Sequence, residues 1–160
     1  MKTRFNIQEI DPNAYTAMSG LEGYVRKTPL KFAYKELMKI RASQINGCAY
    51  CIEMHTVDAR KHGETESRIY ALSAWRESPV FNDEERALLA LTEEVTLIGN
   101  KGLSDETYGE LQKYFDDKTI AQAIMQVVTI NAWNRITISS RIMHAHQLED
   151  AAQSIATSFS

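Results

Sequence analysis

The sequence contains little of what interrupts a helix or crosslinks a chain, since its 160 residues include three prolines, seven glycines and two cysteines. Because glycine and proline break helices, their scarcity favours a helical protein, as does the recurrence of apolar residues at spacings of three and four. Two cysteines in a reducing compartment seldom form a permanent structural crosslink. The composition therefore argues against a scaffold held together by disulfides.

Two further absences each exclude a class of protein. Lys and Arg number 18 against 21 Asp and Glu, without a basic run, so the charge pattern of a nucleic-acid binder is missing. The opening MKTRFNIQEIDPN lacks the apolar segment of a secretory signal. The most apolar late stretch, IAQAIMQVVTI, is too short to span a bilayer and contains Gln122 and Gln126. We expect a soluble cytoplasmic protein that binds neither nucleic acid nor membrane.

The residues that are present describe one folded helical domain over residues 1–160. Apolar residues make up 44% of the sequence and are spread along its length, enough for one core. Asp, Asn, Ser and Pro mark helix starts, and Gly, Asn or a following Pro marks helix ends. The pattern predicts an all-α protein of seven or eight helices, at about 12–28, 30–45, 48–62, 64–77, 83–98, a short one from 104, 117–140, and a last segment with His144 and His146.

The stretch INGCAYCIEMH, residues 45–55, holds both cysteines. Cys48 falls at the start of a predicted helix, where free N–H groups and the helix dipole favour a thiolate and can lower a thiol pKa from about 8.5 to roughly 3.5–7.5. Cys51 and His55 follow three and seven residues later, so all three side chains share one helix face. This arrangement favours a redox-active thiol pair with a proton-transferring imidazole.

Other interpretations of the same residues remain open at this point. A buried cysteine is commonly an inert small hydrophobe. Cys48, Cys51 and His55 also supply three zinc ligands, with His62 as a candidate fourth, although the two histidines lie nearly two turns apart. A thioredoxin fold uses the same cysteine spacing, but it needs strands around the motif, where helices are predicted here.

The segment ELMKIRASQINGCAYCIEMH resembles the core of the alkylhydroperoxidase D-like family, part of the wider carboxymuconolactone decarboxylase superfamily. The shared pattern is Glu, eleven residues, Cys-x-x-Cys, three residues and His. The stretches ERALLALTEEVT and INAWNR are also similar to that family, so the resemblance covers roughly residues 15–140. It implies an all-helical fold, a trimer or hexamer of identical chains, and reduction of hydroperoxides by the thiol pair without metal or cofactor.

Carried over residue by residue, the resemblance makes Cys51 the peroxidatic nucleophile, Cys48 the resolving thiol, and Glu36 with His55 the proton relay. The implied partners are a hydroperoxide and an external dithiol reductant, such as a lipoylated or thioredoxin-like protein. One position departs from the pattern, because Tyr50 stands where some members carry a histidine, and a phenol cannot relay charge as an imidazole does.

Glu36 poses an electrostatic problem, since an ionised carboxylate beside Cys51 would raise the thiol pKa. We therefore expect a partly buried Glu36 with a raised pKa, although a lone helical glutamate is more often a solvated charge, paired here with Lys35 or Lys39. Two other functions remain possible for the chain: a thiol–disulfide carrier or redox sensor without peroxidase turnover, and a helical assembly module whose thiols are incidental.

The remaining candidates are structural. Trp75 and Trp133 are expected as core or interface anchors. Asn131, Asn134 and Arg135 are candidates for a subunit contact. His144 and His146 are expected on the surface or at an interface, and the methionines are expected in the core or a pocket: Met18, Met38, Met54, Met125 and Met143.

Overall fold

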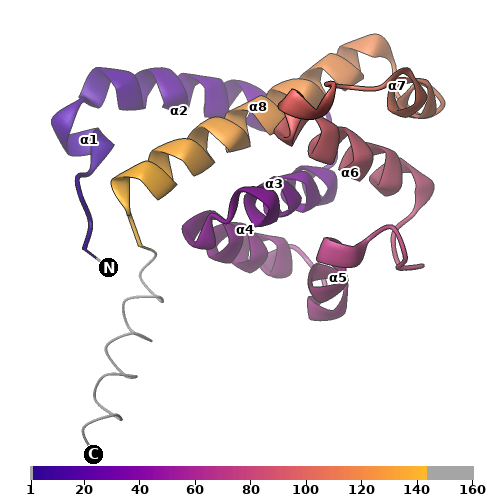
Figure 1. The fold of residues 1–160 in the computed structure, drawn as a ribbon, viewed down its shortest axis with the longest axis horizontal. Coiled ribbons are helices and arrows are strands. Elements are labelled where there is room, and N and C mark those ends of the chain that lie inside the picture. Colours follow the sequence, from indigo (N-terminus) through magenta and orange to yellow (C-terminus); the bar gives the residue numbers. More distant parts are fainter. Residues whose placement is uncertain (1, 144–160) are drawn as a thin grey trace, which may run out of the picture.

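A computed structural model describes residues 2–143, and this part of the chain is all-helical (Figure 1). The predicted fold class is therefore confirmed. The elements are α1 (Ile7–Ile10), α2 (Pro12–Lys27), α3 (Phe32–Asn46), α4 (Ala49–Lys61), α5 (Glu66–Ala71), η1 (Leu72–Ala74), α6 (Asp83–Thr96), η2 (Ile98–Asn100), α7 (Asp105–Leu111) and α8 (Asp117–Ser140).

The helices begin at the capping residues that the sequence indicates. Asp11 accepts a hydrogen bond from the backbone N–H of Ala14 at 3.1 Å, and the proline that follows Asp11 opens α2. Asn82 and Glu85 form a reciprocal capping box at α6. Asp116 caps α8 in the same way as Asp11 caps α2. Local side-chain chemistry thus fixes where these three helices start.

Two elements differ from the sequence prediction. The helix expected at 64–77 is shorter, because α5 gives way to the 3₁₀ turn η1. Nη1 of Arg86, on α6, donates to the carbonyl oxygens of Trp75 and Ser78 at 3.0 and 3.1 Å. These two carbonyl oxygens therefore have hydrogen-bond partners although the helix does not continue. The four-residue helix α1 was not predicted, because one turn is too short to show a periodicity.

Helix α3 lies at the centre of the fold and packs against α4, α6 and α8 (Figure 1). Helix α2 runs beside α8, and the backbone N–H of Arg4 donates to the carbonyl oxygen of Ser140 at 2.8 Å. The largest apolar cluster joins α3, α6, α7 and α8 and includes Tyr34, Met38 and Leu91. The central helix therefore presents one face to the core and another to α4, which carries the cysteines.

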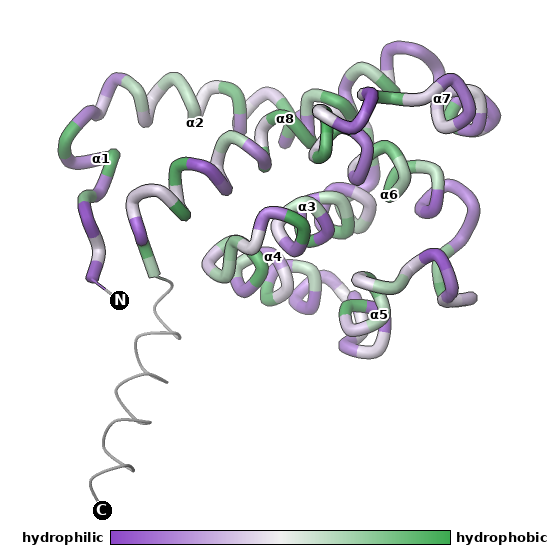
Figure 2. The backbone as a smooth tube through the Cα atoms, viewed as in Figure 1, coloured by the Kyte–Doolittle hydropathy of each residue, from purple (hydrophilic) through white to green (hydrophobic). Residues whose placement is uncertain are grey.

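Apolar and polar residues are mixed along the helices, and α8 shows no uninterrupted apolar run (Figure 2). Within residues 2–143, no helix combines the length and the apolar character that crossing a membrane requires. The predicted last segment, with His144 and His146, lies outside the described residues.

Candidate active site

The two cysteines lie at the junction of α3 and α4. Gly47 ends α3 with a φ of 70°, in the left-handed region that disfavours residues with a Cβ. This turn places Cys48 at the N-cap of α4, where its sulfur accepts a hydrogen bond from the backbone N–H of Cys51 at 3.4 Å. The predicted position of Cys48 at a helix start is confirmed.

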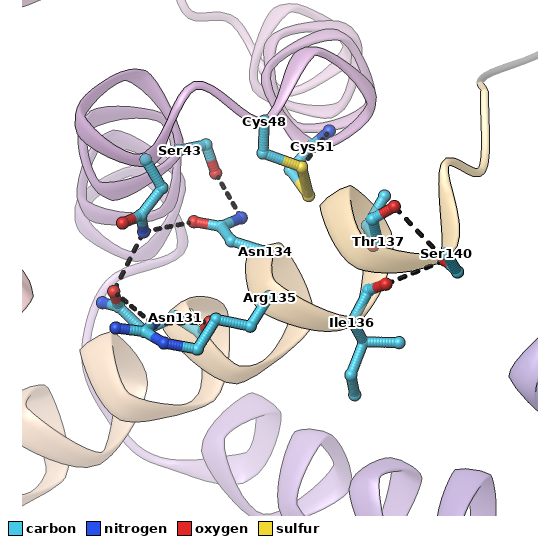
Figure 3. The surroundings of a disulfide bond; sticks show 10 residues. Ser43, Cys48, Cys51, Asn131, Asn134, Arg135, Ile136, Thr137 and Ser140 are labelled. Atoms are coloured by element: carbon cyan, nitrogen blue, oxygen red, sulfur yellow. Dashed lines mark hydrogen bonds between the residues drawn. A yellow bond between two sulfur atoms is a disulfide. The ribbon is translucent and has the colours of Figure 1, made fainter. Parts of the chain in front are cut away.

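Cys48 and Cys51 form a disulfide bond, so the structure holds the oxidised form of the pair (Figure 3). Their Cα atoms are 5.4 Å apart, a usual separation for bonded cysteines. Both residues are buried, and Ala42 and Ile130 belong to the same apolar cluster. The disulfide therefore forms without disrupting the first turn of α4.

A carboxylate, an imidazole and an ammonium group meet between α3 and α4. Nδ1 of His55 is 3.0 Å from Oε2 of Glu36, and Nζ of Lys39 is 2.5 Å from Oε1 of Glu36. Glu36 is 2% exposed and His55 6% exposed, so water screens these contacts little. The structure brings together the two residues predicted as a relay, and it selects Lys39 as the lysine that pairs with the carboxylate.

The protonation state of Glu36 differs from the expectation. Burial raises the pKa of this carboxyl, but the hydrogen bond from His55 and the charge of Lys39 outweigh burial and leave the pKa below its ordinary value. The expected raised pKa is therefore wrong, because two polar partners surround the carboxylate. Since an ionised carboxylate only accepts hydrogen bonds, Nδ1 of His55 carries the hydrogen of their contact.

These groups face a cavity of about 950 Å³ bounded by α1, α2, α3, α4 and α8. Cys51, Glu36 and His55 line the cavity, whereas Cys48 is not among the described residues that do so. Much of the remaining wall is apolar or aromatic: Tyr15, Leu30, Phe32, Tyr50, Met54, Ile130, Trp133 and Ile136. The cavity therefore borders Cys51 and not Cys48.

Amide side chains beside the thiol pair connect α8 to α3 (Figure 3). Nδ2 of Asn46 donates to Oδ1 of Asn131 at 2.9 Å and to Oδ1 of Asn134 at 2.8 Å, and Nδ2 of Asn134 donates to Oγ of Ser43 at 3.0 Å. Both α8 asparagines are buried within the chain. The expectation of a subunit contact is therefore wrong for them, and Arg135 donates to the backbone carbonyl of Asn131 at 2.9 Å.

The two tryptophans have different surroundings. Trp75 is buried in the core, as predicted, and its Nε1 donates to Oε1 of Glu93 at 2.9 Å. Trp133 is half-buried and lines the cavity, where its ring meets that of Tyr15 edge-on at 5.8 Å. The core alternative of the predicted anchor role is confirmed for Trp75, and an interface role of Trp133 stays a prediction.

His62 and Tyr50 also line the cavity. Nδ1 of His62, which was weighed as a fourth zinc ligand, is 2.8 Å from the carbonyl oxygen of Asp58, and its ring centre is 4.1 Å from that of Phe32. Within the described residues, no group of three or more His, Cys, Asp and Glu side chains is placed to hold a metal ion. Tyr50 belongs to the wall at the position where some members of the resembled family carry a histidine.

Sequence reasoning missed several polar residues of the wall, and Gln126 is a buried one. Gln126, on α8, is 3% exposed and lines the cavity, and its Nε2 has no hydrogen-bond partner among the described residues. The available signal was the pair of glutamines, Gln122 and Gln126, one turn apart in an otherwise apolar stretch.

The sequence profile of the carboxymuconolactone decarboxylase family matches residues 12–94, just over half of the chain. The chain belongs to the carboxymuconolactone decarboxylase family. It is similar to the uncharacterised protein YdfG of Bacillus subtilis (strain 168), with 43% identity over 139 residues, which cover 87% of this chain and 95% of YdfG. The family resemblance inferred from the Glu–Cys–Cys–His segment is thus confirmed.

Solved structures show the same fold. A crystal structure of an Agrobacterium tumefaciens protein matches with a TM-score of 0.87 and 40% identity, covering 89% of this chain and 98% of that one. That protein is of unknown function, with a suggested role in antioxidant defence as an AhpD. The debrominase Bmp8 matches with a TM-score of 0.77 and 18% identity, covering 86% of this chain and 74% of that one. The second likeness concerns the fold alone, which hosts more than one chemistry.

Proposed function

We propose that this member of the carboxymuconolactone decarboxylase family is a thiol-dependent hydroperoxide reductase, with Cys51 as the attacking thiol and Cys48 as the resolving thiol. The observation that carries the proposal is that Cys51 lines the cavity beside the His55–Glu36 pair, whereas its disulfide partner does not. The antioxidant role suggested for the Agrobacterium tumefaciens relative is in keeping with this function.

The charges around Cys51 suit proton removal from its thiol. His55 lies one helical turn after Cys51 on α4, so Nε2 can accept the thiol proton in the reduced form. Glu36 then stabilises the imidazolium through Nδ1. Lys39 offsets the negative charge of Glu36, which would otherwise oppose a thiolate nearby. The relay therefore needs no proton on Glu36 itself.

The cycle begins when the Cys51 thiolate attacks the O–O bond of a hydroperoxide, ROOH. Cys51 becomes a sulfenic acid and the bond breaks to give RO⁻, which takes the proton from His55 and leaves as ROH. The Cys48 thiol then attacks the sulfenic sulfur, with loss of water, and forms the disulfide that the structure contains. Two electrons have passed from the thiol pair to the peroxide.

An external dithiol closes the cycle by thiol–disulfide exchange, becoming a disulfide itself and restoring both thiols. Its attack would fall on Cys51, the cysteine that lines the cavity. A lipoylated or thioredoxin-like reductant, a trimeric or hexameric assembly and a cytoplasmic location remain predictions from the sequence.

Turnover of an organic hydroperoxide with a dithiol as reductant tests the proposal. We expect Cys51→Ser to abolish turnover, because the attacking sulfur is lost. We expect Cys48→Ser to form no internal disulfide and to turn over more slowly than the parent, because the dithiol must then reduce the sulfenic acid directly. If both variants turn over like the parent, the proposal is wrong. If peroxide oxidises the pair slowly while dithiols exchange with it rapidly, the protein is a thiol–disulfide carrier instead.

A further inference from the structure

Gln126 is a buried amide whose donor has nothing to bind among the described residues. Gln126 is 3% exposed, and its Nε2 lacks a partner. Buried donors in folded proteins are nearly always paired, because an unpaired one has lost its water without replacement. A residue of this kind in the wall of a cavity indicates that the cavity binds a molecule with a hydrogen-bond acceptor.

The position of Gln126 on α8 relates it to the thiol pair. Gln126, Ile130, Trp133 and Thr137 line the cavity at spacings of four, three and four, which form one face of the helix. Ile130 belongs to the same buried apolar cluster as Cys51. Gln126 lies one turn earlier, about 6 Å along the helix axis. Its amide is therefore within the reach of a small organic molecule whose other end lies at Cys51.

Three other polar residues of the wall are held by contacts within the chain. Lys39 and His55 both contact Glu36. Nζ of Lys35 donates to the carbonyl oxygens of Arg26 and Thr28 at 3.1 and 2.8 Å, at the end of α2. These contacts leave Nε2 of Gln126 as a donor available to a bound molecule.

We propose that Gln126 is a substrate-binding residue whose Nε2 donates a hydrogen bond to an acceptor oxygen of an organic molecule, such as a carbonyl oxygen. The apolar body of that molecule lies against Ile130 and Trp133. A cavity of about 950 Å³ with aromatic walls fits such a molecule far better than hydrogen peroxide. The substrate class is thus an organic hydroperoxide with a second oxygen, and naming a hydroperoxide rests on the proposed function.

Gln122 supplies a matched control. It is the same residue type on the same helix, one turn earlier, and its Oε1 also lacks a partner among the described residues. It is buried, but it does not belong to the described wall of the cavity. If the two glutamines serve only to pair with each other, replacing either one has the same consequence.

The test is equilibrium binding of two probes to the oxidised full-length protein, which cannot turn over: acetophenone, which has a carbonyl oxygen, and ethylbenzene, which does not. Ligand-observed NMR titration gives both dissociation constants. We expect Gln126→Leu to weaken acetophenone binding about tenfold and to leave ethylbenzene within about twofold, because one hydrogen bond is lost. Gln122→Leu should change neither constant.

Three results would overturn the proposal: acetophenone binding unchanged in Gln126→Leu, both probes weakened alike, or the same selective loss in Gln122→Leu. Gln126→Met, which is closer in shape, replaces the leucine variant if that one does not fold. Because binding is measured without peroxide, a selective loss in a protein that shows no peroxidase turnover would contradict the proposed function and leave the binding site intact.

Discussion

Lys35 and Lys39, one turn apart on α3, bind different partners. Lys39 pairs with Glu36, with 11% of the lysine side chain and 2% of the glutamate side chain exposed. Lys35 donates to carbonyl oxygens at the end of α2, where the helix dipole is negative. The sequence offered both lysines as partners of Glu36, and nothing in the spacing distinguished them. The difference comes from tertiary packing, since the end of α2 supplies the carbonyl oxygens that bind Lys35.

We expect Lys39→Met to destabilise the protein by about 3 kcal/mol at neutral pH, because it leaves a buried carboxylate with one partner fewer. It should also raise the pKa of Glu36 and move the acid limb of the peroxidase pH profile upward. Lys39→Arg should restore most of both properties. Urea denaturation and rate measurements at several pH values check these effects.

Lys113→Met is the matched control for this substitution, because Lys113 pairs with Glu110 at the same spacing and the same distance of 2.5 Å, but on the surface. We expect it to change stability by less than about 0.5 kcal/mol. Equal effects of the two substitutions would contradict the role assigned to Lys39.

Glu36 should make stability depend on pH. Because folding lowers the pKa of this carboxyl, its ionised form stabilises the folded state above the ordinary value of about 4.3. That contribution is lost as the pH falls through the lowered pKa. We expect the wild type to be more stable than Glu36→Gln at pH 7 and the difference to shrink below about pH 4. Denaturant titrations of both proteins across this range measure it, and a difference that grows in acid would refute the charge state of Glu36 described above.

At the scale of helices, the junction between α3 and α4 fixes the thiol pair. Gly47→Ala would place a Cβ at a φ of 70°, although no atom lies within 4 Å of it. We therefore expect a loss of roughly 1–2 kcal/mol from backbone strain alone. Gly20→Ala, inside α2 and equally free of contacts, should instead gain roughly 0.5–1 kcal/mol. Thermal or urea unfolding of the two variants gives the comparison, and a stabilising Gly47→Ala would contradict the described turn.

Helix starts and ends were predicted well where local chemistry decides them. The caps at Asp11, Asn82 and Asp116 and the break at Gly47 are properties of short segments. The early end of α5 was not predictable in this way. It depends on Arg86, which reaches carbonyl oxygens from a different helix.

At the scale of the whole molecule, the cavity draws its wall from the consecutive helices α1 to α4 and from α8, which lies far from them in the sequence. The segment 36–55 carries the Cys, His and Glu residues, so this part of the site was predictable. Trp133 and Gln126 come from α8, and only the packing of α8 on α3 brings them to the wall. The same packing buries Asn131 and Asn134, which looked like surface residues when only the sequence was considered.

The central claim is that Cys51 is the thiol which attacks a hydroperoxide. The most direct measurement is mass spectrometry of the Cys48→Ser variant after one equivalent of organic hydroperoxide, in the presence of dimedone, which traps sulfenic acids. The account expects one dimedone adduct per chain on Cys51 and consumption of the peroxide, with no adduct on Cys48 when Cys51→Ser is treated in the same way. Unconsumed peroxide, or an adduct on Cys48 in the Cys51→Ser variant, would contradict it.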